Sequence, residues 1–138
     1  MIGEFIDEII ERAKGDSAFA GFELVKAYEQ TKIKYPIKKP YVTFSTESSK
    51  TSSGFVGTDE YEIFSEVMTV TVTTDEEHGG SFCENCAKNI CMELMKLDKR
   101  KMITSVSVGK CEYDRNIFGY RITMKFGLRE TGIKYGGE

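Results

Sequence analysis

The first thirteen residues alternate apolar and acidic side chains with the spacing of a helix. The apolar positions recur at intervals of three and four residues: Ile2, Phe5, Ile6, Ile9, Ile10 and Ala13. The positions between them hold four carboxylates: Glu4, Asp7, Glu8 and Glu11. This pattern predicts an amphipathic helix over residues 2–13. Lys14 followed by Gly15 is a suitable end for it.

Later segments alternate apolar and polar residues with the period of a β-strand. Strands are predicted over residues 22–30, 41–46, 61–74, 102–113 and 117–128, the last two joined by a turn at Asp114–Arg115–Asn116. From Phe118 to Leu128 every second residue is apolar, so one face of that strand is expected to be buried and the other wet. The alternation slips near Ser65–Val67, which predicts a bulge or bend there.

Residues 47–60 (ESSKTSSGFVGTDE) are rich in Ser, Thr and Gly, which predicts a long flexible hairpin loop. Loops of this length are usually functional or disordered. Phe55 and Val56 form an apolar pair in its middle, which either folds back on its own domain or docks onto a neighbour. The C-terminal residues 129–138 are predicted to be a frayed tail.

The stretch SFCENCAKNIC (residues 81–91) holds three of the four cysteines. Ser81 and Glu84 form a capping box, so a helix is predicted to begin at Phe82 and to end near residues 99–101. The apolar side of this helix holds Cys83, Cys86, Ala87, Ile90, Cys91, Leu94 and Leu97. Met92 and Met95 lie on its polar side, either as isolated surface residues or as part of a partner surface.

The C-x-x-C spacing of Cys83 and Cys86 permits three interpretations: a zinc site, a redox dithiol or core packing. A structural zinc site needs a second ligand pair, which the sequence lacks. In a redox dithiol, the acidic neighbour Glu84 would oppose thiolate formation. Core packing is therefore favoured, with Cys86 and Cys91 buried and metal-free. Cys83, placed in the first helical turn, is expected to be the most reactive.

The order of these elements is α-β-β-β-α-β-β over a single domain of 138 residues. Strands with one polar face and two amphipathic helices predict an α+β, two-layer fold. Its sheet is expected to be mainly antiparallel, with about five strands covered by the two helices.

Composition excludes several classes of function. The chain is 40% hydrophobic and 30% charged with a net charge of −3, and it has no basic cluster, so sequence-specific nucleic-acid binding is not expected. No apolar run approaches the roughly 20 residues that span a bilayer, and the acidic N-terminus does not resemble a secretory signal. His78 is the one histidine, and no catalytic motif accompanies it, so neither an enzyme nor a cofactor is predicted.

The element order, the segment VKAYEQTKIKYPIKKPYVTF (residues 25–44), the long Ser/Gly hairpin tip and the second helix together resemble the tail terminator (tail completion) proteins of tailed bacteriophages and prophages. The resemblance covers residues 1–128 and is one of pattern. It implies an α+β protein that forms a homo-oligomeric ring, typically a hexamer, on the end of the tail tube. Such a ring stops tube growth and joins the tube protein to the head connector protein.

The resemblance also implies where the protein acts: in the bacterial host cytoplasm during assembly, then in the virion tail. The candidate subunit or partner contacts are Phe55, Val56, Met92 and Met95. Two alternatives stay open, namely another head–tail or neck component, and a small cytosolic redox or metal module that uses Cys83 and Cys86.

Overall fold

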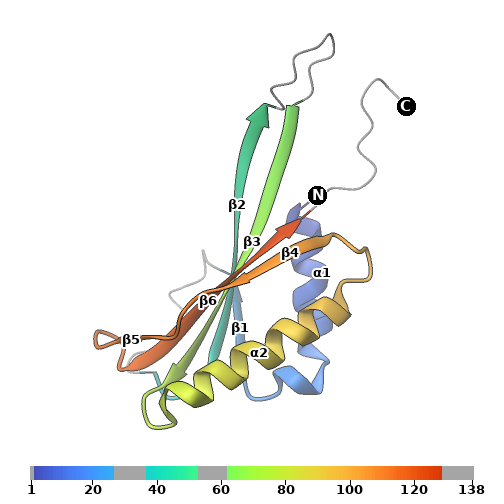
Figure 1. Cartoon of the computed structure of the whole chain (residues 1–138). Helices are drawn as coiled ribbons and strands as arrows, with labels where there is room; N and C mark the ends of the chain where they lie inside the picture. Colours follow the sequence, from blue (N-terminus) through green and yellow to red (C-terminus); the bar gives the residue numbers. More distant parts are fainter. Residues whose placement is uncertain (1, 27–36, 53–61, 129–138) are drawn as a thin grey trace.

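A single sheet of six strands carries two helices in the computed structural model, which describes residues 2–26, 37–52 and 62–128 (Figure 1). The sheet order is β1-β2-β3-β6-β4, with β5 also paired to β6. The elements in chain order are α1 (Ile2–Lys14), η1 (Ser17–Phe19), β1 (Glu23–Lys26), β2 (Tyr41–Ser52), β3 (Glu62–Asp75), α2 (Gly79–Leu97), β4 (Ile103–Val108), β5 (Glu112–Asp114) and β6 (Gly119–Leu128). The α+β class is therefore confirmed.

The sheet is mixed, because β1 runs parallel to β2 while the other pairs are antiparallel. The expectation of a mainly antiparallel sheet is therefore matched in part: four pairings are antiparallel, and the pairing at the β1 edge is parallel. A parallel pair needs a crossover of a dozen or more residues, and residues 27–40 supply that length. Alternation along a strand is the same in both pairings, so the sequence pattern did not distinguish them.

The edge strand is broken, which raises the number of strands from the expected five to six. Both β4 and β5 pair with β6, at Val108↔Met124 and Glu112↔Arg121. Between these pairs the edge strand has one more residue than β6, which is a bulge. The Gly109 N–H lies within it and donates to the Thr123 carbonyl at 2.9 Å. The predicted strand over residues 102–113 is thus two strands.

The β2–β3 hairpin is longer and more regular than expected. Its register is unbroken from Tyr41↔Thr73 to Ser52↔Glu62, so residues 47–52 of the predicted loop belong to β2. The prediction of a bulge near Ser65–Val67 is wrong, because the register between β2 and β3 has no shift at these residues. Backbone ladder hydrogen bonds do not depend on side-chain polarity, so a Ser- and Thr-rich segment can extend a strand. Residues 53–61 and 129–138 lie outside the described residues.

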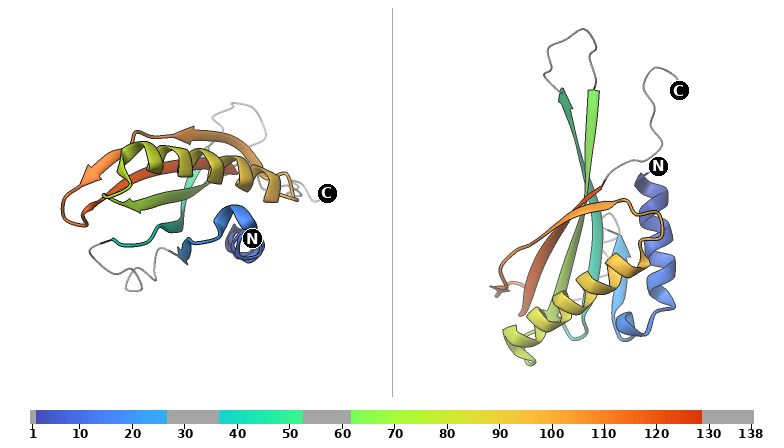
Figure 2. Two further views of the ribbon diagram at one scale, coloured as in Figure 1. Left: turned by 90° about the horizontal axis from the view of Figure 1, so that it is seen from below. Right: turned by 45° about the vertical axis from the view of Figure 1, so that its right-hand side comes forward.

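Both helices pack on one face of the sheet (Figure 2). α2 lies along β3 and β6, and α1 lies beside β1 and β2, where Lys26 forms an ion pair with Asp7. The sheet residues under the helices form cross-strand rows such as Phe44–Val70–Met124, all three fully buried. The alternation of apolar and polar residues along β3 and β6 therefore corresponds to the burial of one face of the sheet, as predicted.

The opposite face of the sheet is polar and has no helix among the described residues. Its central rows consist of Thr43–Thr71–Thr123 and Ser45–Thr69–Lys125. A second, small apolar cluster of Val25, Ile37 and Tyr41 covers one end of this face.

α2 begins at Gly79, three residues before the predicted start. Gly79 adopts φ +82°, a conformation that glycine reaches without strain, and this turn rather than the Ser81–Glu84 box opens the helix. His78 precedes it, with its Nδ1 atom 2.8 Å from the Asp75 carboxylate. Because α2 starts earlier than predicted, each later residue lies further from the N-terminal end of the helix.

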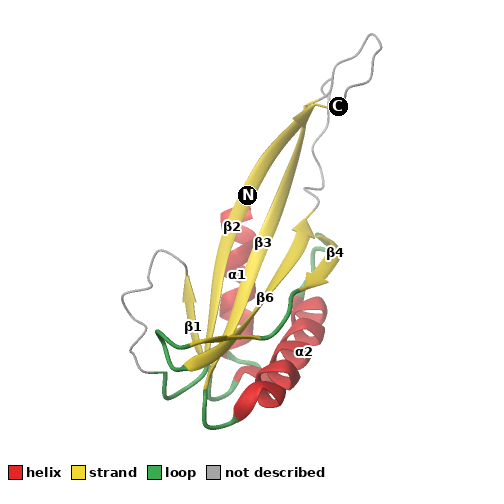
Figure 3. Ribbon diagram, turned by 60° about the vertical axis from the view of Figure 1, so that its left-hand side comes forward, coloured by secondary structure: helices red, strands yellow, loops and turns green. Residues whose placement is uncertain are grey.

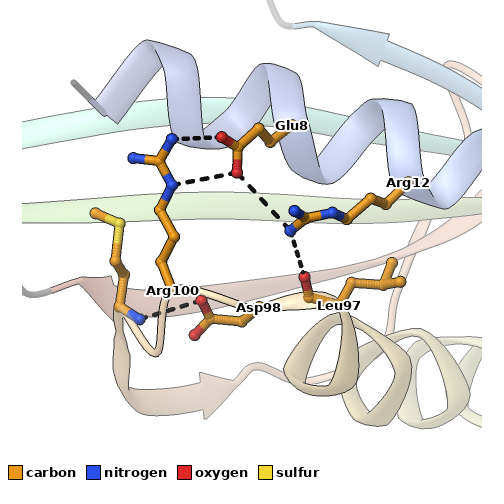
Figure 4. A network of polar contacts seen from close by, with 6 residues as sticks. Glu8, Arg12, Leu97, Asp98 and Arg100 are labelled. Carbon is orange, nitrogen blue, oxygen red and sulfur yellow. Dashed lines mark hydrogen bonds and ion pairs between the residues drawn. The ribbon is translucent and has the colours of Figure 1, made fainter.

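A polar network fixes the other end of α2 (Figure 4). Arg100 pairs with Glu8 of α1, and Arg12 of α1 donates to the Leu97 carbonyl at 3.0 Å. The Asp98 carboxylate accepts hydrogen bonds from the Met102 N–H at 3.1 Å and the Ile103 N–H at 2.9 Å. These contacts set the direction in which the chain leaves α2 and enters β4.

Candidate functional site

A groove of about 610 Å³ separates α2 from the bulged edge strand. Cys91 and Met92 of α2 line one wall, and Val108, Gly109 and Cys111 line the other. Lys88 and Lys110 also border it, together with Glu84 and Asn85. The groove thus combines an apolar floor with a polar rim, the composition that protein interfaces show.

The groove exists because α2 covers the centre of the sheet and leaves its edge uncovered. Val108 pairs with Met124 and continues the buried row of Phe44 and Val70, yet its side chain is 54% exposed. Met92 faces the same groove and is 62% exposed. Two large apolar side chains that flank one hollow form a patch of the kind that partners cover.

A second feature is the arm, the part of the β2–β3 hairpin that extends past the rest of the sheet (Figures 1 and 3). β6 pairs with β3 only from Glu66 onward, and β1 pairs with β2 only as far as Phe44. The pairs from Ser49↔Ser65 to Ser52↔Glu62 therefore have no third strand among the described residues. A two-stranded hairpin alone is marginally stable in water, so the arm is suited to contact a partner.

The arm and the groove lie toward opposite ends of β3. The groove lies level with Ile122, which pairs with Val72, whereas the arm occupies the first residues of β3. At about 3.3 Å per residue, the two are separated by some 20 Å or more along the strand. One subunit therefore presents two distinct surfaces, and its arm is too far from its own groove to occupy it.

The predicted contact residues have different outcomes. Met92 and Met95 are exposed as predicted, but only Met92 lines the groove. Phe55 and Val56 lie outside the described residues. Val108 and Cys111 were missed as site residues, because only the strand break at Gly109 places them opposite α2.

The cysteines require a correction. Cys83 is fully buried and its Sγ atom lies 3.8 Å from the Val72 carbonyl, while Cys86 and Cys91 are half-buried rather than buried. Burial raises the pKa of the Cys83 thiol from 9.0 to about 11 and also raises the pKa of Cys86 and Cys91. Cys83 was expected to be the most reactive cysteine because it was placed in the first turn of the helix. α2 begins earlier, at Gly79, so Cys83 lies beyond the first turn and this reason no longer holds.

The described ranges contain no group of three or more His, Cys, Asp or Glu side chains placed to hold a metal ion. His78 is largely exposed, pairs with Asp75, and its ring lies 4.6 Å from that of Phe82. No helix in the described part of the chain has both the length and the hydropathy needed to cross a membrane.

In comparisons with known proteins, neither a family model nor a curated protein matches this chain. Function is therefore inferred from the chain's own residues and their arrangement.

Proposed function

We propose that this chain is a non-enzymatic assembly protein of a phage or prophage tail, a tail terminator. In this role it forms a ring, typically of six copies, that caps the tail tube and joins it to the head connector. The observation that carries the proposal is the arm, whose paired residues 49–52 and 62–65 extend beyond every other described element. Such an extension contributes little to its own domain, so its natural role is contact with another chain.

Two different surfaces on one subunit favour a ring. When the arm of one copy meets the groove of the next, the contact is heterologous, and repetition gives a closed ring if the rotation closes. Met92 is the proposed contact on the groove side, and Met95, further along α2, is a candidate contact outside the groove. Phe55 and Val56, in the connection between β2 and β3, are the proposed contacts on the arm side.

The charge of the chain suits this role. A lumen through which DNA slides should not bind phosphate strongly, and the chain carries a net charge of −3. Assembly would take place in the host cytoplasm, and the finished ring would belong to the virion tail.

The geometry gives less support to a redox module built on Cys83 and Cys86. A redox dithiol needs an accessible thiol with a lowered pKa, whereas burial raises the pKa of both cysteines here. Another head–tail or neck component remains the alternative proposal, since it would use the same surfaces with a different partner.

The test adds the purified protein to growing tail tubes built from the tube protein of the same genome. The wild-type protein is expected to bind tube ends and stop elongation. An arm-shortened variant, in which an Asn-Gly turn joins Ser48 directly to Glu66, should fold but lose capping, because these two residues are already paired. Circular dichroism and thermal unfolding establish that the variant is folded.

A pair of matched substitutions tests the groove. Met92→Ser should weaken capping by roughly tenfold or more, because burying a methionine contributes about 1.5–3 kcal/mol. Met95→Ser, outside the groove on the same helix, should have a smaller effect. A wild-type protein that ignores tube ends refutes the terminator function, and binding to the head connector alone would favour the neck alternative.

A further inference from the structure

Two lysines lie on opposite walls of the groove. Lys88 belongs to α2 and Lys110 follows the bulge of the edge strand, and both side chains are exposed. Neither forms an ion pair with a carboxylate among the described residues, whereas Lys96 of the same helix pairs with Glu93. Glu84 also borders the groove, so the rim carries two positive charges and one negative charge. The groove therefore has a net positive rim above an apolar floor.

The end of the arm carries the opposite charge. Residues 52–62, which begin at the last residue of β2 and end at the first residue of β3, contain no lysine or arginine and three acidic residues, Asp59, Glu60 and Glu62. The net charge of this segment, −3, equals that of the whole chain, so the remaining residues are neutral in sum. The same segment contains the apolar pair Phe55 and Val56. Its composition therefore complements that of the groove.

We propose that Lys88 and Lys110 recognise the acidic residues at the end of the arm of a second copy, so that groove and arm attract each other by charge as well as by apolar contact. The inference rests on the proposed function, because it specifies the contact through which copies form a ring. Two grooves would bring lysine against lysine, and two arms would bring carboxylate against carboxylate, and like charges at an interface are costly. The charges therefore favour the heterologous contact that a ring requires.

The dimensions of the two parts permit this contact. The groove has a volume of about 610 Å³, which is enough for a few apolar side chains but not for a folded domain. The arm extends past the rest of the sheet as two strands, so its end is free to enter a groove of this size (Figures 1 and 3). Some 20 Å or more along β3 separates the arm from the groove of its own chain. The occupant must therefore come from another copy.

The charges would make the contact sensitive to salt. Exposed charges are screened over about 10 Å at 0.1 M ionic strength and over about 3 Å at 1 M. Association between copies should therefore weaken as sodium chloride is raised from about 0.05 M to about 0.5 M. Contact between Met92 or Val108 of the groove and the apolar residues of the arm would not weaken under the same change.

The experiment reverses the charges on each side of the contact. The groove variant carries Lys88→Glu and Lys110→Glu. The arm variant carries Asp59→Lys, Glu60→Lys and Glu62→Lys. Self-association, measured by sedimentation velocity in concentrated solution and on tail tube ends, should be roughly tenfold or more weaker for each variant alone, because each then has a groove and an arm of like charge.

An equimolar mixture of the two variants should recover association. The acidic arm of the groove variant meets the unchanged groove of the arm variant, and the basic arm of the arm variant meets the reversed groove of the groove variant. Copies would then alternate around the ring. The matched control carries Lys38→Glu and Lys99→Glu, which make the same change in net charge at exposed lysines outside the groove. It should associate like the wild type, and circular dichroism establishes that every variant is folded.

The outcomes separate this inference from the proposed function. If the wild-type protein associates but the mixture does not recover association, or if the groove variant associates as well as the wild type, the charge contact is wrong and the ring stands. Association that is unchanged by salt would overturn the inference without any variant. If the wild-type protein associates neither in solution nor on tube ends, the ring and the inference both fail. If the mixture recovers association but the wild-type protein ignores tube ends, the inference stands and the terminator function fails.

Discussion

Replacing Asp98 by alanine removes the acceptor that connects the end of α2 to the start of β4. Asp98 is only 4% exposed, and its carboxylate accepts from the backbone N–H groups of Met102 and Ile103 at 3.1 and 2.9 Å. Its own N–H donates to the Leu94 carbonyl, so the backbone at this residue also closes the last turn of α2. Alanine retains that backbone bond and loses the two made by the side chain.

The size of the effect follows from the two donors that lose their acceptor. Met102 is buried, so its N–H would lose its hydrogen bond without gaining water, at a cost of about 1–3 kcal/mol. Ile103 is partly exposed and its N–H can bind water, so its cost falls at the low end of that range. Asp98→Ala should therefore lower the free energy of unfolding by about 2–4 kcal/mol. Asp98→Asn keeps one acceptor oxygen and should lose about half as much.

Urea unfolding followed by circular dichroism measures this difference, with an unchanged m-value showing that the transition is the same. Lys99→Ala, at the exposed adjacent position, is the control and should stay within about 0.5 kcal/mol of the wild type. A loss below about 1 kcal/mol for Asp98→Ala would refute the reasoning, because it would mean that both N–H groups find other acceptors at little cost.

Two further substitutions test the packing of the sheet and the burial of a thiol. A Cβ atom at Gly119 would lie 2.5 Å from the Thr74 carbonyl oxygen, so Gly119→Ala should destabilise the fold by about 1–3 kcal/mol in thermal or urea unfolding. Gly3→Ala, in open space on α1, should be neutral or slightly stabilising. The folded-state pKa of Cys83 is raised above its unfolded value, so its contribution to stability is complete below about pH 9 and is lost as the pH rises toward about 11. Cys83→Ala should lose less stability than the wild type over that interval, and identical pH profiles would contradict the burial of this thiol.

Local periodicity determined the elements that bury one face. The spacing of Phe5, Ile9 and Ala13 predicted α1, and alternation from Tyr120 to Leu128 predicted β6, because both patterns report directly which positions avoid water. The same reasoning placed Met92 and Met95 on the exposed side of α2, as the structure confirms.

Tertiary structure decided how these elements combine. Three features depend on which strand lies next to which: the parallel pairing of β1, the extension of β2 to Ser52 and the bulge at Gly109. The alternation of side chains along one strand does not identify its neighbouring strand, so the sequence pattern did not predict these features. The burial of the cysteines also depends on how α2 packs on the sheet: Cys83 is fully buried, whereas Cys86 and Cys91 are half-buried, and their shared apolar side of the helix does not distinguish them.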